Sequence, residues 1–293
     1  MVHHDSVSRK IFNVFNILFF LVIITLCLYP LWYIFVQSLS SGPLAVNAVA
    51  WPINFTLKNY ADIFKSGDVP HAFLISVLRT SIGTACTLLA CMLLGYLFSK
   101  EDMPLRKVMY RILIITMYVS GGLIPTYLVY KAYRLTNSFL VYILPAVVDA
   151  YYVILIKTYV EQLPISVEES AMIDGAGTMC IFLKIILHMS LPIVATIAIY
   201  ASVGQWNSWF DNHIYAISNK KILTLQYMLY RYLQEAESIV RELKERDPGA
   251  AVPITPRGVR MTVTMITVVP VLCIYPFFQR YLIKGLMIGA VKG

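Results

Sequence analysis

The sequence predicts an all-α fold, a polytopic bundle of transmembrane helices, from its composition and from the pattern of its apolar residues. The chain has 293 residues, of which 58% are hydrophobic and 14% are charged, whereas a soluble domain is about 45–50% apolar and about 25% charged. Its mean hydropathy is +0.69. The apolar residues form long continuous runs, whereas the strands of a transmembrane β-barrel alternate apolar and polar residues. These observations exclude an ordinary cytosolic enzyme, a disordered protein and a nucleic-acid-binding domain.

Six apolar runs reach the length of about 20 residues that a helix needs to cross a hydrocarbon core. We expect one transmembrane domain over residues 1–293, with a core at about 71–283. Prolines lie inside or near the ends of several runs and predict kinked helices, which a membrane bundle tolerates when neighbours satisfy the freed carbonyls. The predicted spans are residues 12–36, 73–98, 108–130, 139–160, 191–210 and 261–283, and the prolines are Pro30, Pro125, Pro145 and Pro270.

The distribution of Lys and Arg favours an orientation with both termini in the cytoplasm, because basic residues concentrate in cytoplasmic loops. The predicted outer loops before the fifth span hold only Lys58, Lys65, Lys131 and Arg134. The predicted fifth loop, residues 211–260, is basic and external, which opposes this orientation, although long loops obey the rule less strictly.

That fifth loop is the longest polar segment of the chain. Residues 223–246 have the pattern of a helix, which should end at Asp247, Pro248 and Gly249. The segment is longer than a simple connection needs. It therefore either contacts something outside the membrane or covers the bundle as a solvated cap.

The segment between the fourth and fifth spans, residues 161–188, predicts a short helix, a glycine turn and a second helix. Ser166 and Glu169 have the spacing of a capping box. The first helix, only about 12 Å long, should end near Gly175, since glycine adopts the left-handed conformation at helix ends. Such a helix suits docking into a partner's groove, or it lies on lipid as an interfacial helix. In the second helix Lys184 points away from an apolar stripe of Ile181, Phe182, Ile185 and Ile186.

Polar residues inside the spans are candidates for a substrate pathway, because a charge at a helix centre costs about 2.5–3.5 kcal/mol on insertion scales. For Arg79 we favour snorkelling to the outer headgroups. Asp149 is the better candidate, because carboxylates bind hydroxyl groups and the neighbouring Tyr151 and Tyr152 can stack on sugars. Packing against another subunit is its alternative.

Four residues at the end of the fifth span form a second group of candidates. Interfacial tryptophan is typical of the aromatic belt, but an amide cluster at a channel mouth can also face substrate. The residues are Gln205, Trp206, Asn207 and Trp209.

The sequence shows no catalytic, metal-binding or nucleotide-binding pattern. His188 and His213 are isolated, and no phosphate-binding G-x-x-x-x-G-K-[ST] loop occurs. We therefore expect a chain that is not an enzyme and binds no cofactor or metal. A self-sufficient secondary transporter of sugars is one alternative, although Asp149 is the only clear buried carboxylate for ion coupling. A membrane-embedded enzyme or anchor is the least favoured.

Several motifs together resemble a known family. Residues 169–171 (ESA), 174–176 (DGA) and 191–192 (LP) resemble the E-A-A…D-G-A…L-P signature of ATP-binding-cassette (ABC) importer permeases. The resemblance covers about residues 12–293 and is most similar to carbohydrate-importer permeases of the LplC/YtcP-like group, related to the second permease of the maltose importer. Further matching segments are residues 120–127 (SGGLIPTY), 204–210 (GQWNSWF), 275–281 (YPFFQRY) and 284–293.

Two positions depart from the signature. Ser170 replaces an alanine, and a small residue there should preserve close packing. His188 stands where the signature usually has a proline, so we expect the second helix to run straighter into the fifth span.

The resemblance implies a type I importer permease fold (MetI-like) and a role as the non-catalytic membrane subunit of a binding-protein-dependent oligosaccharide importer. It implies as partners a second, homologous permease, two ATPase subunits that use ATP and Mg²⁺, and an extracytoplasmic sugar-binding protein, in a bacterial cytoplasmic membrane. The substrate is expected to be an acidic, uronate-type oligosaccharide, and the fifth loop to probe the binding protein. The C-terminal tail, Ala290, Val291, Lys292 and Gly293, would reach the ATPase. Coupling to the ATPase would involve Glu168, Glu169, Ser170, Ala171, Asp174, Gly175, Ala176 and Gly177.

Overall fold

The computed structural model describes residues 7–41, 45, 47–65, 68–234, 258 and 260–273. These residues form helices and turns and no strand, which confirms the predicted all-α fold. The chain packs as two compact units, Met1–Gly67 with Arg231–Val268 and Asp68–Tyr230 with Val269–Gly293. The single transmembrane domain stays a prediction, and each unit is described by itself.

The first unit is built on α1 (Val7–Ser38), a helix of 32 residues that includes Pro30. Its apolar window has no buried residue, so its side chains are available to lipid or to another subunit. The short α2 (Lys58–Lys65) is fastened to the end of α1 by hydrogen bonds. The Ser38 and Tyr60 hydroxyls are 2.8 Å apart, and the Asn59 amide donates to the Ser38 carbonyl at 3.0 Å.

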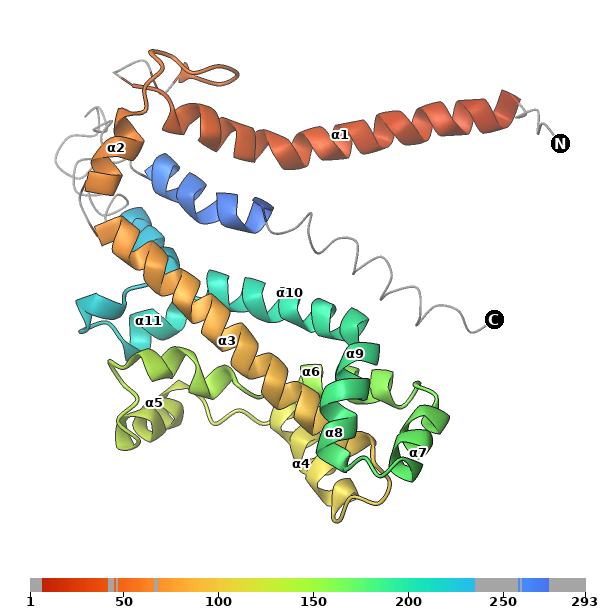
Figure 1. Ribbon diagram of the computed structural model, residues 1–293. Coiled ribbons are helices and arrows are strands. Elements are labelled where there is room, and N and C mark those ends of the chain that lie inside the picture. The colour runs from red at the N-terminus through yellow and green to blue at the C-terminus, as the bar shows by residue number, and fades with distance from the viewer. Residues whose placement is uncertain are drawn as a thin grey trace. The chain divides into compact units, whose positions relative to one another are not determined.

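The second unit is organised around α3 (Asp68–Ser99), which runs beside α10 (Leu191–Asn207) in Figure 1 and also packs against α6 (Ala150–Val160). The three helices carry few charged residues and bury aliphatic and aromatic side chains against one another, as expected for a membrane bundle. The core is formed by Cys91, Met92, Tyr96, Phe98, Val153, Ile156, Val160, Ile181, Phe182, Ile186 and Ile197.

The third predicted span is broken into two helices, with a bend much sharper than the kink predicted near Pro125. It is split into α4 (Arg106–Tyr118) and α5 (Leu123–Ala132), which are bent by 120°. The chain turns at Gly122, whose φ of +80° is unfavourable for residues with a side chain. Pro125 then lies in the first turn of α5, where its missing N–H costs no helical hydrogen bond.

The fourth predicted span bends by 44° between the 3₁₀ segments η2 (Phe139–Tyr142) and η3 (Leu144–Ala146) and the helix α6. Pro145 lies in η3, just before the bend, and this confirms the kink predicted there. Asp149 then caps α6, where its carboxylate accepts hydrogen bonds from two backbone N–H groups.

The chain enters the fifth predicted span through α7 (Ile165–Ile173), α8 (Thr178–Ile181), the π-helical η4 (Phe182–Ile186) and α9 (Leu187–Met189). The segment Thr178–Met189 is bent by 80° against α10, so the expected straighter path was wrong. Pro192 in the first turn of α10 explains the bend, because proline has no N–H and its ring clashes with the carbonyl four residues earlier. One proline is enough to interrupt the helix.

The remaining described elements are α11 (Phe210–Tyr215), η5 (Lys220–Ile222) and helical residues 225–234 and 260–273. Of the helix predicted over 223–246, the part beyond 234 lies outside the described residues. Within the described ranges two helices are long and apolar enough to cross a membrane, or up to five if each bent pair is one span. The sixth predicted span continues beyond residue 273, so the number of six stays a prediction.

Candidate functional site

The first candidate site is the short helix α7 and its glycine turn. Pro164 precedes the helix at the N-cap position, and no side chain caps it. The predicted capping box was therefore wrong. Ser166 already lies inside the helix, where its carbonyl accepts a hydrogen bond from the Ser170 hydroxyl at 2.8 Å.

The end of α7 confirms the predicted turn. Asp174 is the C-cap and Gly175 has a φ of +82°, a left-handed conformation that glycine adopts without strain. The Ala176 N–H donates to the Ala171 carbonyl at 2.9 Å, which satisfies one of the free carbonyls at the helix end. Gly177 then caps α8.

One face of α7 is fastened to the end of α3. Glu168 is buried, and its carboxylate forms an ion pair with the Lys100 ammonium group. That ammonium group also lies 4.6 Å from the centre of the Tyr96 ring, close enough for a cation–π interaction. Glu168 therefore faces its own chain, whereas Glu169 on the same helix is exposed.

A second ion-pair network lies beside this contact. The Arg106 guanidinium donates to Glu161 Oε1 at 2.7 Å and to the Phe98 carbonyl at 2.7 Å, and Lys157 reaches the other oxygen of Glu161 at 2.7 Å. The network joins the start of α4, the end of α3 and the end of α6. Glu161, which lies just before α7, is thereby bound to both Arg106 and Lys157.

The outer face of α7 carries large apolar side chains that the sequence did not single out. Ile165 is 71% exposed, Met172 is 52% exposed and Ile173 is 86% exposed. The sequence carried no periodic signal for this exposure, because the apolar and polar residues of α7 are not segregated on separate faces of the helix. In the helix that follows, the predicted stripe is confirmed by the buried Ile181, Phe182 and Ile186, with Ile185 half-buried and Lys184 exposed. Of the predicted coupling residues, Ser170, Asp174, Gly175 and Gly177 are exposed, and Ala171 and Ala176 pack against the core.

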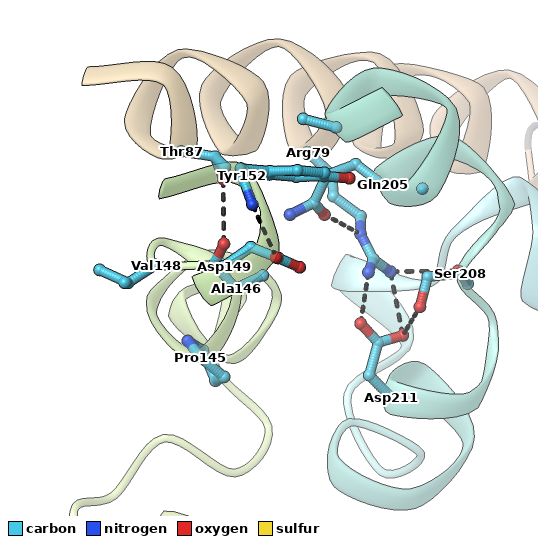
Figure 2. A pocket seen from close by; sticks show the side chains of 12 residues that line it. Arg79, Thr87, Pro145, Ala146, Val148, Asp149, Tyr152, Gln205, Ser208 and Asp211 are labelled. Atoms are coloured by element: carbon cyan, nitrogen blue, oxygen red, sulfur yellow. Dashed lines mark hydrogen bonds and ion pairs between the residues drawn. The ribbon is translucent and has the colours of Figure 1, made fainter. Parts of the chain in front are cut away.

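The second candidate site is a cavity of about 270 Å³ between α3, the start of α6 and the end of α10. Figure 2 shows Arg79 on one side of this cavity and Asp149 on the other. The predicted snorkelling of Arg79 was wrong, because the residue is 3% exposed and its guanidinium is held by other side chains. Its cation lies in an ion pair inside the second unit.

Arg79 is held from several directions. Its Nε donates to Gln205 Oε1 at 3.0 Å, and Nη1 donates to the Ser208 carbonyl at 3.2 Å and to Asp211 Oδ1 at 3.0 Å. Nη2 contacts the second oxygen of Asp211, so the carboxylate and the guanidinium form a two-point ion pair. The guanidinium carbon also lies 4.6 Å from the centre of the Tyr142 ring.

The structure brings only part of the predicted pathway residues together. Arg79, Asp149, Tyr152 and Gln205 line the cavity, together with Thr87, Ser208 and Asp211, which the sequence did not indicate. Trp206 packs edge-on against Phe73, Trp209 stacks on Tyr230 with ring centres 4.1 Å apart, and Tyr151 and Asn207 are exposed. The predicted C-terminal contact, residues 290–293, lies outside the described residues.

The segment after α10 is joined to the cavity by Asp211. Burial, together with the Asp211 carboxylate, raises the pKa of Tyr215 above its usual value, so its hydroxyl stays neutral in the physiological range. Asn212 is fully buried, and its Oδ1 accepts a hydrogen bond from the Thr224 N–H at 2.8 Å. In the part of the chain that the structure describes, no group of three or more His, Cys, Asp or Glu residues is arranged to hold a metal ion.

A bundle of bent apolar helices with a polar cavity and a short surface helix is the arrangement of a membrane permease subunit. Comparison with curated proteins specifies the family. The chain is 31% identical to the polygalacturonan/rhamnogalacturonan transport system permease protein YtcP of Bacillus subtilis (strain 168), over 98% of this chain and 100% of that one. It is 32% identical to protein LplC of the same organism, over 99% and 98%. The chain belongs to the permeases of ABC sugar import systems.

Structural comparison agrees with this assignment at the level of the fold. A crystal structure of a bacterial ABC transporter involved in the import of the acidic polysaccharide alginate matches with a TM-score of 0.81 and 24% identity, over 94% of this chain and 98% of that chain. No family model matches the sequence. The alternative of a self-sufficient secondary transporter gains no support from these relatives.

Proposed function

We propose that this chain forms half of the translocation pathway of an ATP-driven oligosaccharide importer and transmits the motion of an ATPase through α7. A second permease, homologous to this chain, would supply the other half, two ATPase subunits would bind ATP and Mg²⁺, and an extracytoplasmic binding protein would deliver the sugar. Closure of the ATPase pair would turn the permease pair between inward-facing and outward-facing states, as in other rigid-body transitions.

The two-sided character of α7 carries this proposal. Its inner face is fixed by the ion pair between Glu168 and Lys100, while its outer face exposes Ile165 and Ile173. A short helix that is attached to its own chain by an ion pair and exposes large apolar side chains suits insertion into a protein groove. The exposed Glu169 lies on the same helix and supplies a charge for pairing.

Substitution of Gly175 tests the coupling. A Cβ atom here would meet no atom of the described residues within 4 Å, but the φ of +82° strains any residue that has a side chain, so the effect of added bulk in a docking groove has to be separated from backbone strain by a matched control. We expect Gly175→Lys to reach the membrane and to abolish sugar-stimulated ATP hydrolysis by the reconstituted complex. Unchanged ATP turnover would count against the coupling role.

Gly175→Asn is the matched control for the backbone. Asparagine tolerates positive φ better than other residues with a side chain, so the turn is preserved with a smaller addition. We expect this variant to retain more sugar-stimulated turnover than Gly175→Lys. Equal loss in both variants would mean that the turn tolerates no side chain of any size and would leave the docking of α7 to be shown by cross-linking Ile173→Cys to the ATPase.

The proposal also assigns each segment of the chain to one side of the membrane. Both termini would lie in the cytoplasm of a bacterial cell, with α7 on the same side as the ATPase and residues 211–260 outside. The tail at residues 290–293 would reach the ATPase pair, and the external segment would contact the binding protein. The apolar helices α1 and α3 support the placement in the membrane. Labelling of single cysteines from each side of the membrane tests this topology.

We propose an acidic, uronate-bearing oligosaccharide as the substrate. The name of the relative YtcP refers to polygalacturonan and rhamnogalacturonan, which are polymers that contain galacturonate. The basic residues of residues 211–260 suit an acidic sugar or an acidic binding protein. Measuring the affinity of the cognate binding protein for matched neutral and acidic oligosaccharides tests this assignment, and a preference for neutral sugars would refute it.

A further inference from the structure

The cavity contains the guanidinium of Arg79, which its neighbours hold in a fixed orientation at the place where a sugar would pass. Arg79 is 3% exposed, and two uncharged partners, Gln205 Oε1 and the Ser208 carbonyl, fix the plane of its guanidinium. Arginine in a fixed plane recognises a carboxylate through two parallel hydrogen bonds. At present that carboxylate belongs to Asp211, which also lines the cavity.

The two partners of this ion pair differ in their freedom to move. The Arg79 side chain is 3% exposed, whereas the Asp211 side chain is 21% exposed. Asp211 also has hydrogen bonds that do not involve the arginine, from the Ser208 hydroxyl at 3.0 Å and from the Asn212 N–H at 2.9 Å. It can therefore give up the guanidinium without losing all of its partners, whereas Arg79 would keep only the uncharged Gln205 and Ser208 carbonyl as hydrogen-bond partners among the described residues.

The opposite wall of the cavity offers a hydrogen-bond acceptor. Oδ1 of Asp149 accepts hydrogen bonds from the N–H groups of Tyr151 and Tyr152 at 2.8 and 3.3 Å, and Oδ2 has no hydrogen-bond partner among the described residues. Figure 2 shows this carboxylate directed into the cavity toward the side that holds Arg79. A carboxylate in this position accepts hydrogen bonds from hydroxyl groups, and the half-buried Tyr152 lines the same space.

The size of the cavity limits what it can hold. About 270 Å³ is slightly less than the range of about 300–1,000 Å³ typical of sites for drug-sized ligands, so it suits one sugar unit rather than a chain of units. A uronate unit carries both groups that the walls would bind, a carboxylate for the cation and ring hydroxyls for Asp149. A neutral sugar carries only the hydroxyls.

We propose that Arg79 is a binding site for the carboxylate of a uronate unit, and that Asp211 occupies this site until the substrate carboxylate takes its place. This inference rests on the proposed import of acidic oligosaccharides and names the residues that recognise their charge. The exchange replaces one carboxylate by another, so the buried guanidinium keeps a charged partner, and the more exposed Asp211 keeps its two uncharged donors. Because Asp211 lies in the first turn of α11, its release also removes one of the contacts that join the start of residues 211–260 to α3.

Binding of two probes to the assembled transporter, purified without its binding protein, tests the exchange. The probes are trigalacturonate and its fully methyl-esterified form, which has the same backbone without the charges. We expect Asp211→Asn to tighten the binding of trigalacturonate by about tenfold (about 1.4 kcal/mol), because the internal competitor is removed. The affinity for the ester should stay unchanged, because the ester does not compete for the guanidinium.

The double variant Arg79→Gln/Asp211→Asn serves as the second arm. It removes both charges together, so neither is left unpaired, whereas Asp211→Asn leaves the buried guanidinium without a carboxylate until the probe binds. We expect it to bind the acid and the ester with equal affinity. The thermal transition of each purified variant shows whether it is folded.

The outcomes separate this inference from the proposed function. The exchange is overturned if Asp211→Asn changes the affinity for both probes equally, if the double variant still prefers the acid, or if the wild-type complex does not bind trigalacturonate. The proposed function fails separately if the complete complex, with binding protein and ATP, imports no oligosaccharide. Import of the acid with unchanged probe affinities in the variants would refute the exchange alone.

Discussion

Gly95 on α3 lies so close to Ile156 on α6 that a Cβ atom on Gly95 would come within 2.5 Å of the Ile156 Cγ2 atom. It would also lie 3.2 Å from the backbone nitrogen of Lys157. Small residues let helices approach closely in membrane bundles, where van der Waals packing drives association. This contact joins the helix that holds Arg79 to the helix that Asp149 caps.

Gly95→Ala should therefore destabilise the second unit. Neither the backbone of α6 nor the branched Ile156 can easily move away, and overpacking of a dense core costs about 1–3 kcal/mol. We expect a lower thermal transition temperature of the detergent-solubilised protein. Gly204→Ala on α10 is the control, since a Cβ there meets nothing within 4 Å. Equal transition temperatures for the two variants would show that the crossing is looser than described.

Removal of the charge on Lys100 should loosen α7. Lys100→Gln leaves the largely buried Glu168 carboxylate without its cation, and a hydrogen bond to a charged group contributes about 1.5–3 kcal/mol. We expect faster hydrogen–deuterium exchange in residues 165–173. The exchanged pair Lys100→Glu/Glu168→Lys should restore much of the protection, whereas the exposed Lys184→Gln should have no effect. Failure of the exchanged pair would mean that the local geometry, rather than the charge pairing, holds the helix.

Substitutions of Tyr142 should separate two contributions to the cavity wall. Its hydroxyl donates to the Ile222 carbonyl at 2.9 Å, and its ring lies beside the Arg79 guanidinium. Tyr142→Phe keeps the ring and should cost about 1 kcal/mol for the lost hydrogen bond. Tyr142→Leu also removes the cation–π contact and should lower the transition temperature further. Equal transition temperatures for Tyr142→Phe and Tyr142→Leu would show that the aromatic ring does not contribute to stability through its contact with Arg79.

Asn212 should hold the start of the external segment in place. Its buried Oδ1 accepts hydrogen bonds from the Thr224 N–H and hydroxyl at 2.8 and 3.2 Å. Asn212→Ala leaves these donors without their partner, at a cost of about 1–3 kcal/mol. We expect faster proteolysis between α11 and residue 225 in membrane vesicles. The exposed Asn207→Ala should be cleaved at the wild-type rate, and a similar acceleration in both variants would contradict the role of Asn212.

The long helices were predictable because their signal is local and strong. The uninterrupted apolar runs at residues 12–36 and 73–98 correspond to α1 and α3. The sharp break within the third run was not predictable in the same way, because apolar content does not show where the backbone turns. The Ser-Gly-Gly sequence that ends at Gly122, followed closely by Pro125, was the available sign of a break.

In the candidate sites, too, local features could be predicted from the sequence and long-range contacts could not. The turn at Gly175 depends on the conformation of one residue, and its neighbours in the sequence indicate it. The cap formed by Asp149 was also readable, because aspartate before a run of helix-forming residues is a common N-cap. The pairing of Arg79 with Asp211 was not, because the two residues are 132 positions apart and a single sequence does not record which distant residues meet.

The exposure of α1 has a consequence for biosynthesis. Because no residue of its apolar window is buried among the described residues, the apolar side chains of α1 themselves supply free energy for its transfer from the translocon into lipid. The helix can settle in the bilayer while the ribosome is still making the later ones. The bent pairs, by contrast, leave backbone groups free at their breaks, and neighbouring helices or water have to satisfy these groups.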